Sequence, residues 1–376
     1  MKLNFVCPCL MGVEKLVSQE LSDMGAENVK AENGRVLFSG DFSTMARANI
    51  RVRYGERILI LLSRFKAKTF DELFEGVKAI NWHDFIGLKD CFPVKGRTIN
   101  SKLFSIPDCQ SIIKKAIVEK LKTKYRTSWF EETGSTYQIQ FLILKDEVSI
   151  MIDTTGEPLY KRGYKRNVTK APIRETLAAA MVKLAHIRYN SLLIDPFCGS
   201  GTILIEACLY ELNVAPGLRR SFACEDWKII PKDVFSKERT KAVNEIRRDS
   251  EFTAIGYDCD PKVIEIAKEN AKIAGVASKI KFETRDVRDF SLNTDHRPIS
   301  IICNPPYGER MLDIEKARDI YRIISKKFPI SNGINYYIIT PDSNFEEIFG
   351  RVADKKRKLY NGMIKCYYHM YFKNNK

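Results

Sequence analysis

The sequence has few of the patterns that mark metal, redox or pyrophosphate sites. It holds four histidines, and its ten cysteines include no Cys-x-x-Cys pair, so we expect no metal site. The cysteines of Cys7-Pro8-Cys9 are too close for an ordinary disulfide. Neither Gly-Lys-Ser/Thr nor Gly-x-Gly-x-x-Gly occurs, which weighs against a loop that binds pyrophosphate.

Long apolar runs are also missing. No stretch of about 18 consecutive apolar residues occurs, and no basic segment leads into an apolar run at the start of the sequence. We therefore predict a reduced, cytoplasmic protein without a membrane anchor. Positive charge is in excess, with a formal net charge of +15 and a pI near 9.2. The basic residues lie in both halves of the chain, which favours a nucleic-acid partner over a merely basic soluble protein.

The length of 376 residues predicts two or three domains. Residues 1–65 combine strand-like runs with an amphipathic helix, so we predict a small α+β domain there. In residues 66–165, lysines alternate with Ile113 and Ile117 at helical spacing, which predicts one buried and one basic face. The runs "YQIQFLILKD" and "EVSIMIDT" predict two strands after that helix.

Cations and aromatic residues alternate in "LYKRGYKRNVTK", which follows these strands. This mixture is typical of a surface that contacts phosphates and bases, although a basic linker would also explain it. For the lysines of the preceding helix, the alternative is a merely solvated surface. The predicted RNA-binding residues are Lys114, Lys115, Lys161, Arg162, Lys165 and Arg166.

Residues 166–376 alternate strand-like runs with helical ones. The strands "SLLIDPF", "FTAIGYD", "KIKFETRD", "ISIICNPPY" and "INYYIIT" predict a parallel, doubly wound α/β sheet. Asn361-Gly362 lies between two further strand-like runs and predicts a tight antiparallel hairpin that closes the sheet. This Rossmann-like sheet with a closing hairpin is the layout of class I methyltransferases.

The first of these strands ends in a glycine-rich loop. In parallel sheets the ligand lies beyond the carboxyl ends of the strands. Gly199 and Gly201 allow a sharp turn, and the helix that starts near Thr202 offers unpaired N–H groups for a carboxylate. The predicted loop residues are Asp195, Pro196, Phe197, Gly199, Ser200, Gly201 and Thr202.

Acidic residues follow the next two strands. Asp258 is placed to accept hydrogen bonds from ribose hydroxyls, whereas Asp260 is placed to start the following helix as its cap. The alternative is that both are caps or turn residues. Asp286 is placed to accept from an adenine amino group, with Asp289 as the alternative.

The fourth strand ends in Asn304-Pro305-Pro306-Tyr307. Proline has no N–H, so the strand ladder stops here, and the Pro305 carbonyl and the Asn304 side-chain oxygen remain as acceptors. Two convergent acceptors suit an exocyclic amino group, and Tyr307 is available to stack on the base. We therefore predict Asn304, Pro305, Pro306 and Tyr307 as the catalytic residues, with Asn304 also at the cofactor.

Two cysteines flank this predicted site. A nucleophilic Cys198 or Cys303 would indicate methylation at a pyrimidine carbon. Both follow apolar runs, which favours small core residues instead.

The chain resembles the THUMP-domain RNA guanine-N2 methyltransferases, especially the bacterial enzymes that modify 23S ribosomal RNA. The resemblance rests on "KRGYKRNVTKAPIRETLAAAMV", "LLIDPFCGSGTILIEAC", "APGLRRSFACEDW", "GYDCDP" and "NPPYGERM", in this order. It implies a ferredoxin-like domain at 1–65, a THUMP domain at 66–165 and a methyltransferase domain at 166–376. It further implies S-adenosylmethionine as cofactor, held by the Asp195–Thr202 loop, Asp258 and Asp286.

The function that this resemblance implies is methylation of the guanine N2 amino group in RNA. Ribosomal RNA is the favoured substrate, and transfer RNA is the alternative. A non-catalytic RNA-binding assembly factor is a different class of hypothesis, which the glycines, the strand-end acids and Asn304 argue against. DNA-adenine and protein-glutamine methyltransferases also use Asn-Pro-Pro-Tyr.

Overall fold

The structure is a computed structural model that describes residues 2–127, 129–165, 173–187, 190–292, 297–308, 311–329 and 331–372. The chain divides into two compact units. The first comprises Met1–Pro8, Ser18–Leu159 and Ser221–Thr240, and the second comprises Cys9–Val17, Tyr160–Arg220 and Lys241–Lys376. The predicted division into three domains at residues 65 and 165 stays a prediction.

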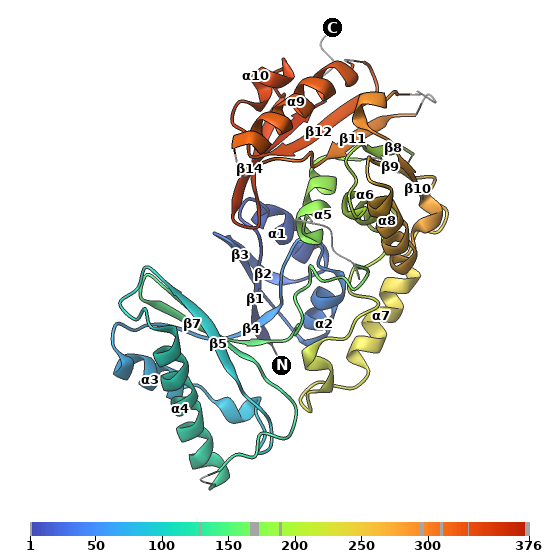
Figure 1. The fold of residues 1–376 in the computed structure, drawn as a ribbon. Coiled ribbons are helices and arrows are strands. Elements are labelled where there is room, and N and C mark those ends of the chain that lie inside the picture. Colours follow the sequence, from blue (N-terminus) through green and yellow to red (C-terminus); the bar gives the residue numbers. More distant parts are fainter. Residues whose placement is uncertain are drawn as a thin grey trace. The chain divides into compact units, whose positions relative to one another are not determined.

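The first unit is built on one seven-stranded sheet with the order β2-β3-β1-β4-β7-β6-β5 (Figure 1). Its strands are β1 (Leu3–Pro8), β2 (Glu27–Glu32), β3 (Arg35–Gly40), β4 (Leu59–Lys66), β5 (Val94–Ile99), β6 (Ile139–Leu144) and β7 (Glu147–Asp153). The sheet runs through both predicted N-terminal domains, because β4 pairs with β1 on one side and with β7 on the other.

The helices of the N-terminal half follow local sequence signals. They are α1 (Glu14–Asp23), α2 (Phe42–Arg51), α3 (Phe70–Lys78) and α4 (Ile106–Tyr125), with the short 3-10 helix η1 (Trp82–Asp84). Thr69 and Glu72 form a capping box that starts α3. Ile113 and Ile117 of α4 are fully buried while Lys115 is exposed, as the predicted two-faced helix requires.

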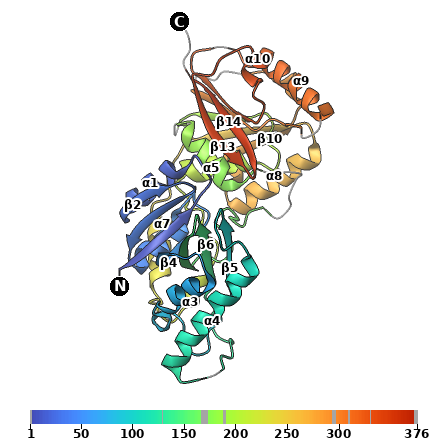
Figure 2. The ribbon, with the colours of Figure 1, turned by 90° about the vertical axis from the view of Figure 1, so that its left-hand side faces the viewer.

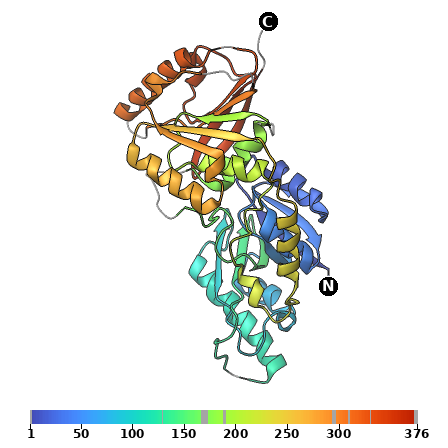
Figure 3. The ribbon, with the colours of Figure 1, turned by 90° about the vertical axis from the view of Figure 1, so that its right-hand side faces the viewer.

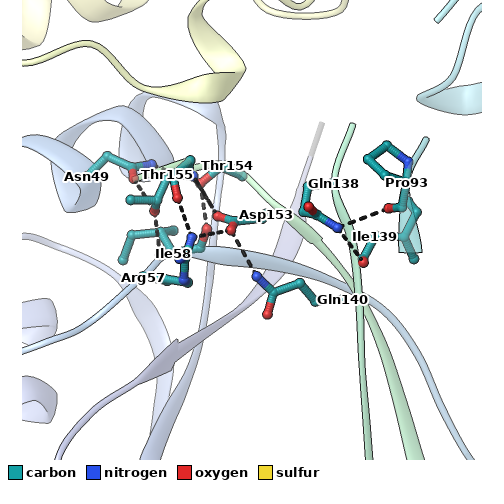
Figure 4. A network of polar contacts seen from close by, with 11 residues as sticks. Asn49, Arg57, Ile58, Pro93, Gln138, Ile139, Gln140, Asp153, Thr154 and Thr155 are labelled. Atoms are coloured by element: carbon teal, nitrogen blue, oxygen red, sulfur yellow. Dashed lines mark hydrogen bonds and ion pairs between the residues drawn. The ribbon is translucent and has the colours of Figure 1, made fainter. Parts of the chain in front are cut away.

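A buried polar network joins strands and helices of this unit (Figure 4). Asp153 accepts a hydrogen bond from Gln140 at 2.9 Å and pairs with Arg57. The Asn49 amide donates to Thr154 Oγ1 at 2.9 Å and accepts from Thr155 Oγ1 at 2.7 Å. Because buried polar groups need such partners, this network fixes α2 against the ends of β4 and β7.

The second unit contains the predicted parallel sheet, in the order β10-β9-β8-β11-β12-β14-β13. Its strands are β8 (Leu192–Asp195), β9 (Thr253–Asp258), β10 (Ile280–Thr284), β11 (Ile299–Cys303), β12 (Ile334–Thr340), β13 (Lys355–Asn361) and β14 (Ile364–Tyr371). The strands from β10 to β12 pair in parallel, and β14 pairs antiparallel with β12 and β13. The predicted fold class is thus confirmed.

Helices cover both faces of this sheet. The helical elements in this half of the chain are α5 (Glu175–Leu184), α6 (Thr202–Glu211), η2 (Ala223–Asp226), α7 (Val234–Asn244), α8 (Pro261–Ala274), η3 (Ala277–Lys279), η4 (Val287–Asp289), α9 (Met311–Lys327) and α10 (Phe345–Phe349). Of these, η2 and most of α7 belong to the first unit and not to the second. Figures 1 and 3 show α5, α6 and α8 on one face and α9 and α10 on the other. Tyr321, Ile324 and Phe328 of α9 pack into the apolar core under β8, β11 and β12.

One predicted helix is shorter than expected. The run "ETLAAAMVKLAHIRYN" predicts a helix that includes His186, but α5 ends at Leu184. His186 is exposed and has a φ of +49°, so the chain turns out of the helix there.

Within the described ranges, no helix combines the length and the apolar character that crossing a bilayer requires. The same residues contain no cluster of three or more His, Cys, Asp or Glu side chains placed to hold a metal ion.

Candidate active site

A cavity of about 1230 Å³ lies at the carboxyl ends of β8, β9, β10 and β11. It is lined by every predicted cofactor and catalytic residue except Gly201: Asp195, Pro196, Phe197, Gly199, Ser200, Thr202, Asp258, Asp286, Asn304, Pro305, Pro306 and Tyr307. Ligand cavities in proteins measure about 300–1000 Å³, so this one has room for a cofactor and part of a substrate.

Asp195 is the last residue of β8 and lines the cavity. Its Oδ1 accepts the Phe197 backbone N–H at 3.0 Å, and the side chain is almost fully buried. The pKa of Asp195 is raised from 3.8 to about 8, chiefly by burial. The Phe197 hydrogen bond offsets part of this rise, and the nearby Asp258 carboxylate adds to it. In the unliganded protein this carboxyl therefore favours its protonated form near neutral pH.

Replacing Asp195 with asparagine should change how stability depends on pH. Because its pKa is raised from 3.8 to about 8, Asp195 stabilises the unliganded fold below pH 4, and this contribution is lost as the pH rises to about 8. We expect Asp195→Asn, which keeps the acceptor for Phe197, to gain stability relative to wild type as the pH rises through this window. Urea denaturation at several pH values measures the difference in free energy of unfolding, and a constant difference would contradict the prediction.

The two glycines of the loop after β8 have different roles. Gly199 has a φ of +52°, and its N–H donates to Asp258 Oδ2 at 3.1 Å. Gly201 has a φ of +81°, and a Cβ there would lie 3.1 Å from the Phe282 ring. Gly201 therefore allows α6 to start close against β10 rather than lining the cavity.

Asp258 links this loop to β9. Its Oδ2 accepts from Gly199 and its Oδ1 accepts the Asp260 N–H at 3.0 Å. Each oxygen keeps further acceptor capacity toward the cavity. Asp260 accepts a hydrogen bond from the Lys262 N–H and caps α8, which agrees with its interpretation as a helix cap.

Asp286 lines the cavity after β10 and caps η4. Its Oδ1 accepts from the Arg288 backbone N–H at 2.8 Å and from the Arg288 guanidinium at 3.1 Å. Asp286 lines the cavity, whereas the competing Asp289 is not among the lining residues. The geometry thus favours Asp286 over Asp289 for a ligand contact.

The loop after β11 brings its side chains to the same cavity. Pro305 is buried, Asn304 and Tyr307 are half-buried, and Pro306 is exposed. The Tyr307 hydroxyl accepts a hydrogen bond from the Asn361 amide at 2.5 Å. The sequence marks Asn361 as a turn residue, and nothing in its local pattern indicates this contact.

Cys198 and Cys303 are buried at the ends of the loop and strand they occupy. Burial raises the pKa of both thiols well above the ordinary value, and the Asp195 carboxylate raises them further. Neither is poised as a thiolate nucleophile, which supports the interpretation as small core residues.

Two predicted RNA-binding cations lie inside the second unit. Arg162 pairs with Glu206 of α6 at 3.5 Å, with side-chain exposures of 2% and 0%. Lys165 pairs with Glu175 of α5 at 3.4 Å and donates to the Ile173 carbonyl. The prediction that Arg162 and Lys165 face RNA is therefore wrong, because both charges are neutralised by buried acids.

The other predicted cations are more accessible. Lys161 and Lys115 are exposed. Lys114 is about one-third exposed, with its Nζ 2.5 Å from Glu132 and 3.5 Å from the centre of the Phe92 ring. Arg166 lies outside the described residues.

Comparison with known proteins identifies the family. The family described as "RMKL-like, methyltransferase domain" matches residues 162–370. The chain belongs to the RMKL-like methyltransferase family. The RlmL ferredoxin-like domain matches residues 4–59 of this methyltransferase, and the THUMP domain matches 67–153. The resemblance to THUMP-domain methyltransferases is thus confirmed.

Individual relatives cover nearly all of this methyltransferase. "Putative RNA methyltransferase YpsC" of Bacillus subtilis is 44% identical, across 99% of this chain and 96% of that protein. "Ribosomal RNA large subunit methyltransferase K/L" of Psychromonas ingrahamii is 31% identical across 97% of this chain, which spans about half (49%) of that relative. The structure of SMU.472, a putative methyltransferase complexed with SAH, has a TM-score of 0.94 and 38% identity, with coverage of 100% and 99%. Family and structure together support S-adenosylmethionine as the cofactor.

Proposed function

We propose that the protein methylates the exocyclic N2 amino group of a guanine in RNA, with 23S ribosomal RNA as the favoured substrate. One observation carries this proposal: a single cavity is lined by the β8 loop, by Asp258 and Asp286, and by Asn304 to Tyr307. The names of YpsC and of the K/L relative support RNA as the substrate, and the THUMP match supports an RNA-binding role.

The cavity residues suit S-adenosylmethionine. The start of α6, with the Ser200 and Thr202 hydroxyls, would hold the methionine carboxylate. Asp258 would accept from the ribose hydroxyls and Asp286 from the adenine amino group. When bound, the cofactor supplies a methyl group on a positively charged sulfur.

The remaining residues would hold the base. The Asn304 side-chain oxygen and the Pro305 carbonyl would accept the two N–H bonds of the target amino group, which directs the nitrogen lone pair toward the cofactor side of the cavity. Tyr307 would stack on the base face. Fixing the two reacting groups in this way is worth about 7–11 kcal/mol of the barrier when alignment is complete. No general base is required, because the product ammonium loses its proton readily.

Methyl transfer from labelled S-adenosylmethionine to protein-free 23S ribosomal RNA and to bulk transfer RNA tests the proposal. Mass spectrometry of the digested nucleosides should find N2-methylguanosine in the ribosomal RNA. N2-methylguanosine found in transfer RNA instead would identify transfer RNA as the substrate. N6-methyladenosine would show that the target base is adenine and not guanine. Cofactor binding without transfer to any RNA would favour a non-catalytic assembly factor.

A further inference from the structure

The β13–β14 hairpin has lysine and tyrosine in alternation on one face. Lys358 pairs with Tyr367 across the two strands, and Tyr360 pairs with Lys365. Directly paired residues of antiparallel strands project to the same face, so these four side chains form one patch, the Lys–Tyr face. The Lys358 Nζ lies 5.4 Å from the centre of the Tyr360 ring, and the Lys365 Nζ lies 5.1 Å from that of Tyr367.

The Lys–Tyr face is open to solvent and positively charged. Both lysines are exposed and both tyrosines are half-buried. Among the described residues, neither lysine forms an ion pair with a carboxylate, whereas the adjacent Lys356 pairs with Glu346 at 2.6 Å. Proteins that bind single-stranded nucleic acid without reading its sequence use exposed cations for the phosphates and aromatic rings for the bases.

The hairpin reaches past the end of its neighbouring strand. β14 pairs with β12 only from Tyr367 onward, and Tyr367 is opposite Thr340, the last residue of β12. The turn between β13 and β14 therefore projects from the carboxyl edge of the sheet, which is the edge that carries the cavity. Figure 2 shows β13 and β14 as one long hairpin at the end of the sheet.

The base of this turn contacts a residue that lines the cavity. Asn361, the last residue of β13, donates from its amide to the Tyr307 hydroxyl at 2.5 Å. Tyr307 lines the cavity beside Asn304. One hydrogen bond thus connects the hairpin that carries the Lys–Tyr face to the loop proposed to hold the target base.

We propose that the Lys–Tyr face binds the RNA strand that flanks the target nucleotide, and that Asn361 positions Tyr307 against the target base. Lys358 and Lys365 contact phosphates, and Tyr360 and Tyr367 stack on neighbouring bases. The inference rests on the proposed function and extends it, because it names the surface of the catalytic unit that receives the substrate.

A double variant of the two lysines tests the surface. Lys358→Gln with Lys365→Gln should weaken binding of protein-free 23S ribosomal RNA, and the slope of log affinity against log salt should fall by about 0.7–0.9 for each lost phosphate contact. Cofactor affinity should not change. Lys355→Gln is the matched control, because Lys355 is exposed on the same strand but pairs with the buried Met370 on the opposite face. Tyr360→Leu should weaken RNA binding about 5- to 150-fold through the loss of stacking.

A double-mutant cycle tests the contact between Asn361 and Tyr307. Asn361→Ala and Tyr307→Phe should each lower kcat, with KM for RNA little changed, because the ring loses its orientation while RNA stays on the Lys–Tyr face. The double variant should be no worse than the poorer single variant. Additive losses would show that the two side chains act independently and would overturn the positioning role.

The outcomes separate the surface from the chemistry. If the wild type methylates RNA but the double-lysine variant matches Lys355→Gln in affinity and salt slope, the Lys–Tyr face is refuted and the proposed function stands. If the wild type binds RNA through this face but transfers no methyl group to it, the proposed function fails and the surface stands.

Discussion

Replacing Asn304 with alanine should remove most of the methyl transfer and leave cofactor binding intact. The Asn304 side-chain oxygen is one of two acceptors proposed to hold the target amino group, and it lies at the cavity wall where β11 ends. Loss of one preorganised polar group that acts on the reacting atoms costs roughly 100- to 1000-fold in kcat. Single-turnover transfer to RNA measures this loss, and calorimetric titration measures cofactor affinity.

The control for this prediction is Asn304→Asp, which retains an acceptor oxygen at the same position. It should recover part of the activity that alanine loses, because one lone pair again faces the amino group. Wild-type turnover in Asn304→Ala would remove the residue from the mechanism. If Asn304→Ala lost cofactor affinity by as much as it lost turnover, Asn304 would act by binding the cofactor and not the target base.

Replacing Glu206 with leucine should strongly destabilise the second unit. Glu206 is buried, pairs with Arg162 at 3.5 Å and accepts from the Tyr164 hydroxyl at 3.0 Å. Its removal leaves the Arg162 guanidinium buried without its acidic partner at that position. Breaking a buried pair on one side costs about 3–5 kcal/mol. Urea denaturation, followed by far-ultraviolet circular dichroism, measures the change in the free energy of unfolding.

An exposed pair serves as the matched control for Glu206. Lys268 and Glu265 on α8 are closer, at 2.8 Å, but their side chains are 50% and 71% exposed. Glu265→Gln should cost about 0–1 kcal/mol, since water screens the pair. The Arg162→Met/Glu206→Leu double variant should lose less than the sum of its single variants. Equal effects of Glu206→Leu and Glu265→Gln would mean that burial does not govern this interaction.

The sequence predicted the sheet of the second unit and most of its cavity because both depend on local patterns. Each parallel strand there is a short apolar run. The residues at its carboxyl end lie at the edge of the sheet where ligands bind, because all parallel strands end at that edge. Asp195, Asp258, Asp286 and Asn304 could therefore be placed together without any long-range information.

The sequence failed where partners are distant or strands are polar. Arg162 and Lys165 look like surface cations because the acids that bury them, Glu206 and Glu175, lie on helices that only the fold brings near. β2 was not predicted, since it is largely exposed and has no apolar alternation. The Asn361 contact with Tyr307 joins the hairpin to a loop 54 residues away.

The path of the chain limits how this enzyme can be divided. The backbone passes from one compact unit to the other after Pro8, Val17, Leu159, Arg220 and Thr240. No single cut therefore yields a complete unit. A gene fragment that starts at residue 166 would lack Tyr160–Lys165 of the second unit and would include Ser221–Thr240, which belongs to the first unit. Evolutionary exchange of either unit between proteins would need several simultaneous joins, so the two should be inherited as a pair.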